Sequence, residues 1–174
     1  MTKKKKYSYN KDLRIYSLLN PPVILPLLPV MQFFMKSFYL TDLPDKKLTK
    51  EKLTVPLSDG KSINALVYSP SDSKRKNMPC IIFYHGGGFV YNAAPHHFTR
   101  AKNLARLTGA KVIFPDYRLA PKHPFPAAVT DAFDAYLFIR KNAFALGIDE
   151  RKIVLCGDSA GGNLCAVTCL IDFL

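Results

Sequence analysis

The stretch that decides the fold is residues 153–167, IVLCGDSAGGNLCAV. Its first four residues form an apolar run of strand length, and an apolar helical pattern follows from Asn163. Between them, Gly157-Asp158-Ser159-Ala160-Gly161 has the spacing G-x-S-x-G, in which the glycines relieve a turn too tight for Cβ atoms. The pattern predicts a serine hydroxyl that is exposed on a sharp turn, beside the free N–H groups of a helix N-terminus.

Strand-like and helical patterns alternate upstream of this stretch. We expect strands over residues 51–57, 62–69, 80–84, 111–114 and 153–156, and helices over residues 96–108, 126–144 and 163–174. The first two strands flank Asp59-Gly60, a strong hairpin signal, and CIIFY at residues 80–84 is typical of a strand buried on both faces. The alternation predicts an α/β fold with a mostly parallel sheet flanked by helices, over residues 51–174.

A second motif, His85-Gly86-Gly87-Gly88, directly follows the strand-like run at residues 80–84. Three consecutive glycines let the backbone come close to a ligand and point N–H groups at it. The lysine of a phosphate-binding loop and the spacing G-x-G-x-x-G are both absent from this part of the sequence. Because HGGG-type motifs supply oxyanion-hole donors in lipases and esterases, the two motifs together indicate a serine acyl hydrolase.

Four segments together resemble the hormone-sensitive lipase family, in its bacterial-type carboxylesterase branch of the α/β-hydrolase fold. They are HGGGF (85–89), DYRLAP (116–121), HPFPAA (123–128) and GDSAGG (157–162). The resemblance covers roughly residues 50–174 and implies that the DYRLAP segment is structural. Lys122 departs from the family pattern, which usually has an acid at this position.

The resemblance also implies roles for the residues of the two glycine-rich motifs. It makes Ser159 the nucleophile, which attacks a small acyl ester and forms an acyl-enzyme. The implied oxyanion hole is formed by the N–H groups of Gly87, Gly88 and Ala160, and the implied supports of the glycine loop are His85, Gly86 and Asp158.

The base and the acid of a serine-hydrolase triad have no clear candidates. In this fold the acid and then the histidine follow the serine along the chain. All four histidines, His85, His96, His97 and His123, precede Ser159, and one acid, Asp172, follows it. We therefore expect an incomplete α/β-hydrolase, its N-terminal portion, that lacks the acid and the histidine and has little activity alone. A rearranged triad that uses His96 or His97 is the alternative.

Residues 1–50 differ in composition and in their predicted elements from the rest of the chain. The apolar residues 21–40 contain four prolines and Lys36, which argues against an uninterrupted membrane-spanning helix. We expect short helices over residues 13–40 and a polar linker over residues 41–50. From the resemblance, we expect residues 1–50 to form a cap-like segment over the acyl pocket.

Positive charge is concentrated in the N-terminal part of the 174 residues, whose net charge is +12. Residues 1–76 contain 15 Lys and Arg against 6 Asp and Glu. Without an accompanying nucleic-acid motif, this charge does not indicate nucleic-acid binding. We expect a solvated tail, with peripheral membrane contact through residues 1–40 and a true membrane anchor as the alternatives.

The composition is that of a globular protein, with 48% hydrophobic and 22% charged residues. The four cysteines (Cys80, Cys156, Cys165 and Cys169) form no CxxC pair and have no histidine cluster near them in the sequence, so we expect no metal site. We expect no cofactor either, because the chemistry that the motifs indicate needs none. We expect Cys165 and Cys169 to be buried, and the chain to lie in a reducing, cytoplasmic compartment. A non-catalytic ligand-binding or interaction module on the same scaffold is the alternative function.

Overall fold

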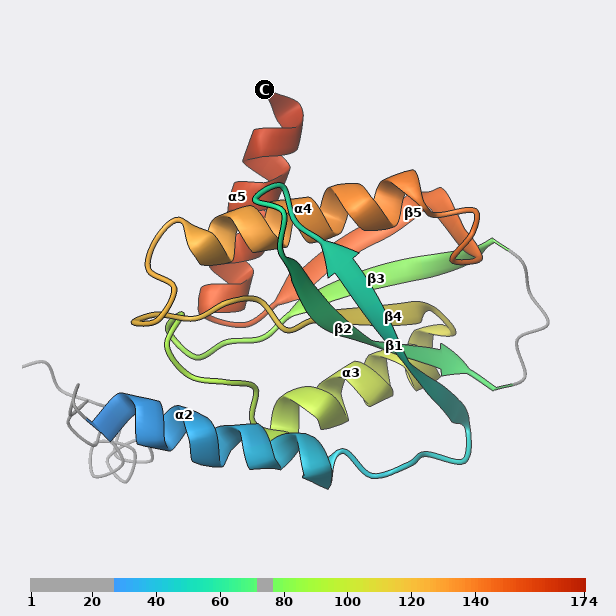
Figure 1. Ribbon diagram of the computed structural model, residues 1–174. Helices are drawn as coiled ribbons and strands as arrows, with labels where there is room; N and C mark the ends of the chain where they lie inside the picture. Colours follow the sequence, from blue (N-terminus) through green and yellow to red (C-terminus); the bar gives the residue numbers. More distant parts are fainter. Residues whose placement is uncertain (1–26, 72–76) are drawn as a thin grey trace, which may run out of the picture.

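The computed structural model describes residues 27–71 and 77–174, and its centre is a five-stranded sheet (Figure 1). The strands are β1 (Leu48–Pro56), β2 (Ser62–Pro70), β3 (Met78–Tyr84), β4 (Lys111–Pro115) and β5 (Ile148–Gly157), in the order β1-β2-β4-β3-β5. β2 pairs antiparallel with both neighbours, whereas β3 pairs parallel with β4 and β5. Four of the five described strands therefore run in one direction, which confirms the mostly parallel sheet.

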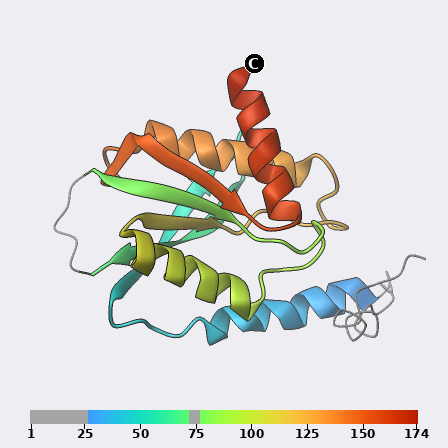
Figure 2. The ribbon, with the colours of Figure 1, turned by 180° about the vertical axis from the view of Figure 1, so that it is seen from behind.

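Helices cover both faces of this sheet. α2 (Leu28–Lys36) and α3 (Pro95–Thr108) lie on one side, and α4 (Ala127–Lys141) and α5 (Ala160–Phe173) lie on the other (Figures 1 and 2). A short 3₁₀ helix, η3 (Ser37–Thr41), follows α2. Two apolar cores result, one that includes Phe83, Phe98, Ala101 and Phe114 beside α3, and one that includes Ile82, Ile113, Ala132 and Leu164 beside α4 and α5.

The hairpin forms at the predicted place. β1 and β2 pair antiparallel along their whole length, from Leu48 opposite Pro70 to Pro56 opposite Ser62. The Leu57 N–H donates to the Lys61 carbonyl over 2.8 Å, and Gly60 has a φ of 80°, which favours glycine. The Asp-Gly pair therefore closes the turn that the sequence indicates.

Some bounds differ from the sequence-based expectation. β1 begins at Leu48, so the predicted linker over residues 41–50 is wrong at its end, because Leu48 is buried and pairs with β2. β5 begins at Ile148 rather than at residue 153, because Ile148 pairs with Met78 ahead of a bulge. α5 begins at Ala160, directly after the serine, so the turn is shorter than expected.

β5 lies at the end of the strand order and pairs, among the described residues, with β3 alone. Val154 on this strand is 58% exposed. Beyond it, the C-terminal half of α5 extends away from the body of the molecule (Figures 1 and 2).

The N-terminal segment is described from residue 27 onward, so the first half of the stretch 13–40, where we expect short helices, lies outside the described residues. α2 has a proline in its first turn, and Gln32 on α2 donates hydrogen bonds to the carbonyls of Val90 and Ala120. Within the described ranges, every helix is too short or too polar to cross a membrane. Cys165 is half-buried and Cys169 is exposed, so the expectation that both are buried is wrong.

Candidate active site

Both glycine-rich motifs lie at the same edge of the sheet. β3 and β5 are parallel neighbours, with Tyr84 opposite Gly157 at their last paired position. The chain after β3 is the glycine loop, residues 85–88, and the chain after β5 is the turn that carries Ser159. Because the carboxyl ends of parallel strands meet at one edge, two segments that are 72 residues apart come into contact, as the hydrogen bond from Gly86 to Asp158 shows.

Ser159 occupies a strained turn between β5 and α5. Its φ of 50° and ψ of −118° are unusual for a residue with a Cβ atom, and its side chain is exposed. A Cβ on Gly161 would lie 1.9 Å from the Tyr84 carbonyl oxygen, and one on Gly157 would lie 2.4 Å from the Gly161 carbonyl carbon. The glycines therefore let α5 begin directly against β3, as G-x-S-x-G predicts.

Three backbone N–H groups near this turn have no acceptor within the two described ranges. Those of Gly87 and Gly88 lie in a loop with φ values of 129° and 60°, and that of Ala160 is the first of α5. A Cβ on Gly87 would lie 2.6 Å from the Tyr91 carbonyl oxygen, so this loop also requires glycine. Free N–H groups at a helix N-terminus and in a glycine loop suit a developing negative charge.

Asp158 joins the glycine loop to the serine turn. Its Oδ1 accepts a hydrogen bond from the Gly86 N–H at 3.2 Å, and a Cβ on Gly86 would lie 2.5 Å from its Oδ2. The same Oδ2 lies 3.3 Å from Nε2 of His97, a buried residue in the first turn of α3. The Asp158 side chain therefore turns toward the glycine loop and α3.

The protonation of His97 follows from its backbone contact. Its Nδ1 accepts the Ala94 N–H at 2.9 Å, so the ring proton of the neutral imidazole is on Nε2 and is donated to Asp158. Burial lowers the pKa of His97 below its ordinary value, which favours this neutral form. The contact with Asp158 is therefore a hydrogen bond from a neutral ring.

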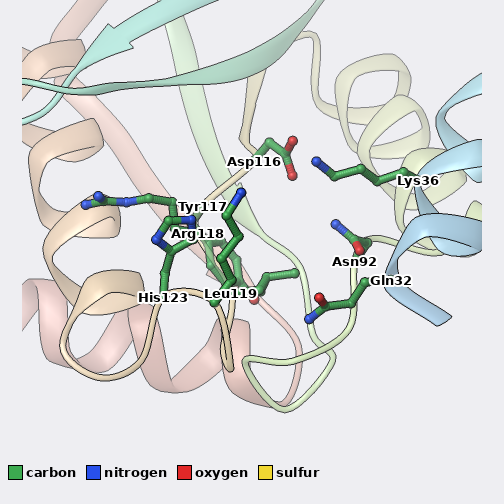
Figure 3. Close-up of a pocket in the computed structure, with 9 residues that line it drawn as sticks. Gln32, Lys36, Asn92, Asp116, Tyr117, Arg118, Leu119 and His123 are labelled. Atoms are coloured by element: carbon green, nitrogen blue, oxygen red, sulfur yellow. The ribbon is translucent and has the colours of Figure 1, made fainter. Parts of the chain in front are cut away.

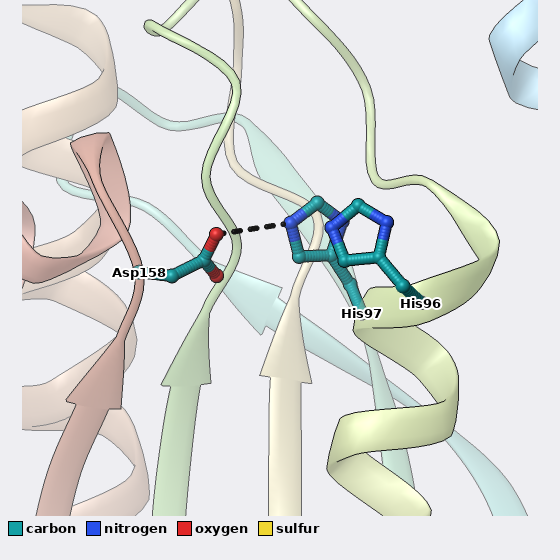
Figure 4. A group of neighbouring side chains, drawn as sticks. All are labelled: His96, His97 and Asp158. Carbon is teal, nitrogen blue, oxygen red and sulfur yellow. Dashed lines mark hydrogen bonds and ion pairs between the residues drawn. The ribbon is translucent and has the colours of Figure 1, made fainter. Parts of the chain in front are cut away.

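His96, His97 and Asp158 form a group whose possible ligand atoms lie within 4.8 Å of one another (Figure 4). A metal ion on Nε2 of His97 would need the lone pair there and would move the ring proton to Nδ1. The protonated Nδ1 could then no longer accept the Ala94 N–H, because two hydrogen-bond donors would face each other. The donor set therefore does not fit a metal ion while this backbone contact is in place.

His85 is fully buried behind the glycine loop. Its ring stacks on Tyr117 with centroids 4.5 Å apart, and Nδ1 lies 2.6 Å from the Gly86 carbonyl, to which it donates. Burial lowers the pKa of His85 to about 4. The Tyr117 hydroxyl in turn donates to the His85 carbonyl over 2.7 Å. His85 thus supports the loop and is a weak base.

The segment after β4 braces the glycine loop from the other side. The Arg118 guanidinium binds the buried carboxylate of Asp131 through two nitrogens, and the Arg118 N–H donates to it as well. The Ala120 N–H donates to the Phe89 carbonyl. These contacts fit the structural role that the resemblance implies for DYRLAP.

Two cavities adjoin the segment after β4, residues 116–121, which we call the brace. One of about 160 Å³ lies between α2 and the brace; Lys36 extends across it toward Asp116, which also accepts the Tyr39 hydroxyl (Figure 3). A larger cavity of about 480 Å³ is lined mainly by apolar groups, including Phe89, Val129 and Val167, and also by Gly88. The apolar cavity therefore begins at the glycine loop.

The predicted site residues come together in one place, whereas His85 and His97 are not placed to act as a base for Ser159. His97 and His85 each donate their ring proton within the scaffold, and among the described residues no side chain hydrogen-bonds the Ser159 hydroxyl. Sequence reasoning missed the contact between His97 and Asp158, and the Asp131 brace. A histidine and an aspartate 61 residues apart give no local signal of such a contact.

Comparisons with known proteins identify the fold and the family of the chain. A family model described as alpha/beta hydrolase fold matches residues 81–172. Carboxylesterase NlhH of Mycobacterium tuberculosis is 35% identical over 154 residues, which are 88% of this chain and 42% of NlhH. Hormone-sensitive lipase of Ictidomys tridecemlineatus is 37% identical over 129 residues, 74% of this chain and 17% of that protein.

A solved hyperthermophilic esterase of the archaeon Pyrobaculum calidifontis is 40% identical, with a TM-score of 0.72 over 87% of this chain and 52% of its own. The chain thus spans between 17% and 52% of these relatives' lengths. The resemblance to hormone-sensitive lipase and bacterial carboxylesterases is confirmed. The chain belongs to the alpha/beta hydrolase family.

Proposed function

We propose that this chain is the nucleophile-bearing part of a carboxylic-ester hydrolase. The observation that carries the proposal is the strained, exposed Ser159 at the head of α5, beside unpartnered N–H groups of a glycine loop. The names of its relatives include carboxylesterase and ethyl acetate hydrolase, which are consistent with ester chemistry.

In the proposed reaction, the Ser159 Oγ attacks the carbonyl carbon of an ester and its proton passes to a base. The carbonyl oxygen becomes an oxyanion, which accepts hydrogen bonds from the N–H groups of Gly87, Gly88 and Ala160. The tetrahedral intermediate collapses, the alcohol leaves with the proton and an acyl-serine remains. A water molecule then hydrolyses the acyl-serine and regenerates the Ser159 hydroxyl.

The base and its orienting acid are proposed to come from residues outside these 174. His97 has no lone pair free on Nε2, and the low pKa of His85 makes it a poor proton acceptor. His96 is exposed beside His97, with ring centroids 3.9 Å apart, and within the described ranges no acid hydrogen-bonds it. The geometry thus gives little support to a triad rearranged around His96 or His97.

The proposed substrate is a small acyl ester. The apolar cavity of about 480 Å³ begins at Gly88, so it can receive an apolar chain of an ester held by the glycine loop. Phe125 at this cavity is 87% exposed and leaves it open to solvent.

The test uses a p-nitrophenyl phosphonate, which modifies an activated serine covalently, and mass spectrometry to identify the modified residue. We expect slow modification at Ser159 and none of that site in Ser159→Ala. Imidazole in solution should accelerate it, because an external base replaces the missing one. Modification elsewhere, or ester hydrolysis at rates that Ser159→Ala retains, would contradict the proposal.

A second function, a non-catalytic ligand-binding module, is favoured by the same apolar cavity in a site without a base. It predicts saturable binding of an apolar ester analogue that Ser159→Ala leaves intact. Turnover that depends on Ser159, with or without imidazole, would count against it.

We also propose a reducing, cytoplasmic location with peripheral membrane contact. All four cysteines are unpaired, which suits a reducing compartment. Val30, Phe33 and Phe34 on α2 are 51%, 76% and 65% exposed, so this helix presents apolar side chains that suit a membrane surface.

A further inference from the structure

His97 stands out as a buried histidine with a complete set of partners at the edge of the site. Its ring bridges two places: Nδ1 accepts the backbone N–H of Ala94, and Nε2–H donates to Asp158. The first contact lies within α3 and caps its first turn. The second reaches across 61 residues to the serine turn, beyond the needs of the helix.

Asp158 connects His97 to the glycine loop through its two carboxylate oxygens. One carboxylate oxygen accepts from His97 and the other accepts from the Gly86 N–H. The Asp158 side chain is 29% exposed, so without His97 it has room to rotate toward water. The peptide of Gly86 is directly followed by Gly87 and Gly88, whose N–H groups are the proposed oxyanion donors.

We propose that His97 is a positioning residue of this site, which holds the Asp158 carboxylate against the Gly86 peptide and thereby orients the glycine loop. The inference rests on the proposed function for its effect on Ser159 chemistry. The chain of contacts itself, from α3 through Asp158 to the loop, is testable without any turnover.

Two substitutions separate the two contacts of the ring. His97→Asn keeps an acceptor at the position of Nδ1, so it can still receive the Ala94 N–H, but its shorter side chain places no N–H at the position of Nε2, from which His97 donates to Asp158. His97→Gln places an amide N–H near the position of Nε2, so it can still donate to Asp158. His96→Ala is the matched control, because it removes the neighbouring ring without either contact.

The first readout is the Gly86 amide of the full chain, followed by nuclear magnetic resonance and hydrogen exchange. In His97→Asn we expect a shifted Gly86 signal and about tenfold faster exchange, as for a lost hydrogen bond to a charged acceptor. The Gln variant and His96→Ala should retain the parent behaviour. An unchanged Gly86 amide in His97→Asn, or equal effects of the Asn and Gln variants, would overturn the proposal.

The second readout is the rate of Ser159 modification by the phosphonate. A misplaced glycine loop should slow it about tenfold in His97→Asn, with recovery in His97→Gln. If the parent chain shows no modification at Ser159, the proposed function fails, whereas the Gly86 comparison still decides the positioning role. If the Gly86 amide exchanges faster in His97→Asn but the rate of Ser159 modification is unchanged, the orienting role is overturned.

Discussion

The close approach of α5 to β3 gives the sharpest test of how the serine turn is built. A Cβ on Gly161 would lie 1.9 Å from the Tyr84 carbonyl oxygen, 2.6 Å from its carbonyl carbon and 2.9 Å from the His85 carbonyl oxygen. All three atoms belong to the backbone of the strand end and cannot rotate away. Ordinary contact begins at 3.4 Å, so Gly161→Ala must separate the helix from the strand by about 1.5 Å.

The next residue of the same helix is a natural control. A Cβ on Gly162 would meet nothing closer than 3.5 Å, which is ordinary contact, so Gly162→Ala adds a methyl group without a clash. Overpacking at Gly161 should cost about 3 kcal/mol, the upper end of the usual range, because backbone must move. Alanine at position 162 should instead stabilise by up to about 1 kcal/mol through helix propensity.

Thermal unfolding followed by circular dichroism separates the two outcomes. For a chain of this length we expect Gly161→Ala to lower Tm by about 6–12 °C and Gly162→Ala to raise it by about 2–4 °C. The phosphonate reaction at Ser159 should also slow in Gly161→Ala. If Gly161→Ala melts at or above the parent Tm, the tight packing of the turn against β3 is refuted.

Three further perturbations test other parts of the structure. Asp131→Ala should cost about 3 kcal/mol in urea unfolding, because it leaves the Arg118 guanidinium without its buried partner; a cost below about 1 kcal/mol would contradict this. Asp42 is buried, and although burial alone would raise its pKa, hydrogen bonds from Lys50, Tyr68 and Lys102 lower it overall. Its contribution to stability is therefore present above pH 3.8 and lost as the pH falls through its folded pKa. In Asp42→Asn, the free energy of unfolding should therefore decrease less on acidification than in the parent chain. Phe33→Ser should reduce flotation with anionic liposomes, since Phe33 is 76% exposed; equal flotation of variant and parent would exclude contact through this side chain.

The sequence predicts the elements that local chemistry decides. Asp59-Gly60 predicts the hairpin turn because a positive φ at Gly60 closes it, and G-x-S-x-G predicts the elbow because no side chain fits at Gly161. It misses the start of β5, where the polar residues 149–152 look like a loop. They are strand because Ile148 pairs with Met78 at the edge of the sheet, where polar side chains can face water.

The contacts that complete the site depend on tertiary structure. Asp158 adjoins the serine in the chain, but its direction is set by Gly86 in the glycine loop after β3 and by His97 at the start of α3. The ring proton of His97 is fixed on Nε2 because the Ala94 N–H donates to Nδ1, a contact that the sequence does not reveal. For the same reason, the sequence indicates His97 as a candidate base, whereas in the structure its Nε2–H donates a hydrogen bond to Asp158.

These contacts also explain how the proposed half of a serine-hydrolase site can be preformed. The strain at Ser159 is held by Gly157 and Gly161 against the end of β3, and the glycine loop is held by Asp158 and His85. All of these groups lie on β3, β5 and the segments that directly follow them, so the proposed nucleophile and the proposed oxyanion donors need no base to keep their places. In the proposed reaction a base would therefore only add proton transfer to this preformed geometry, which is why we expect a small external base such as imidazole to suffice for part of the rate.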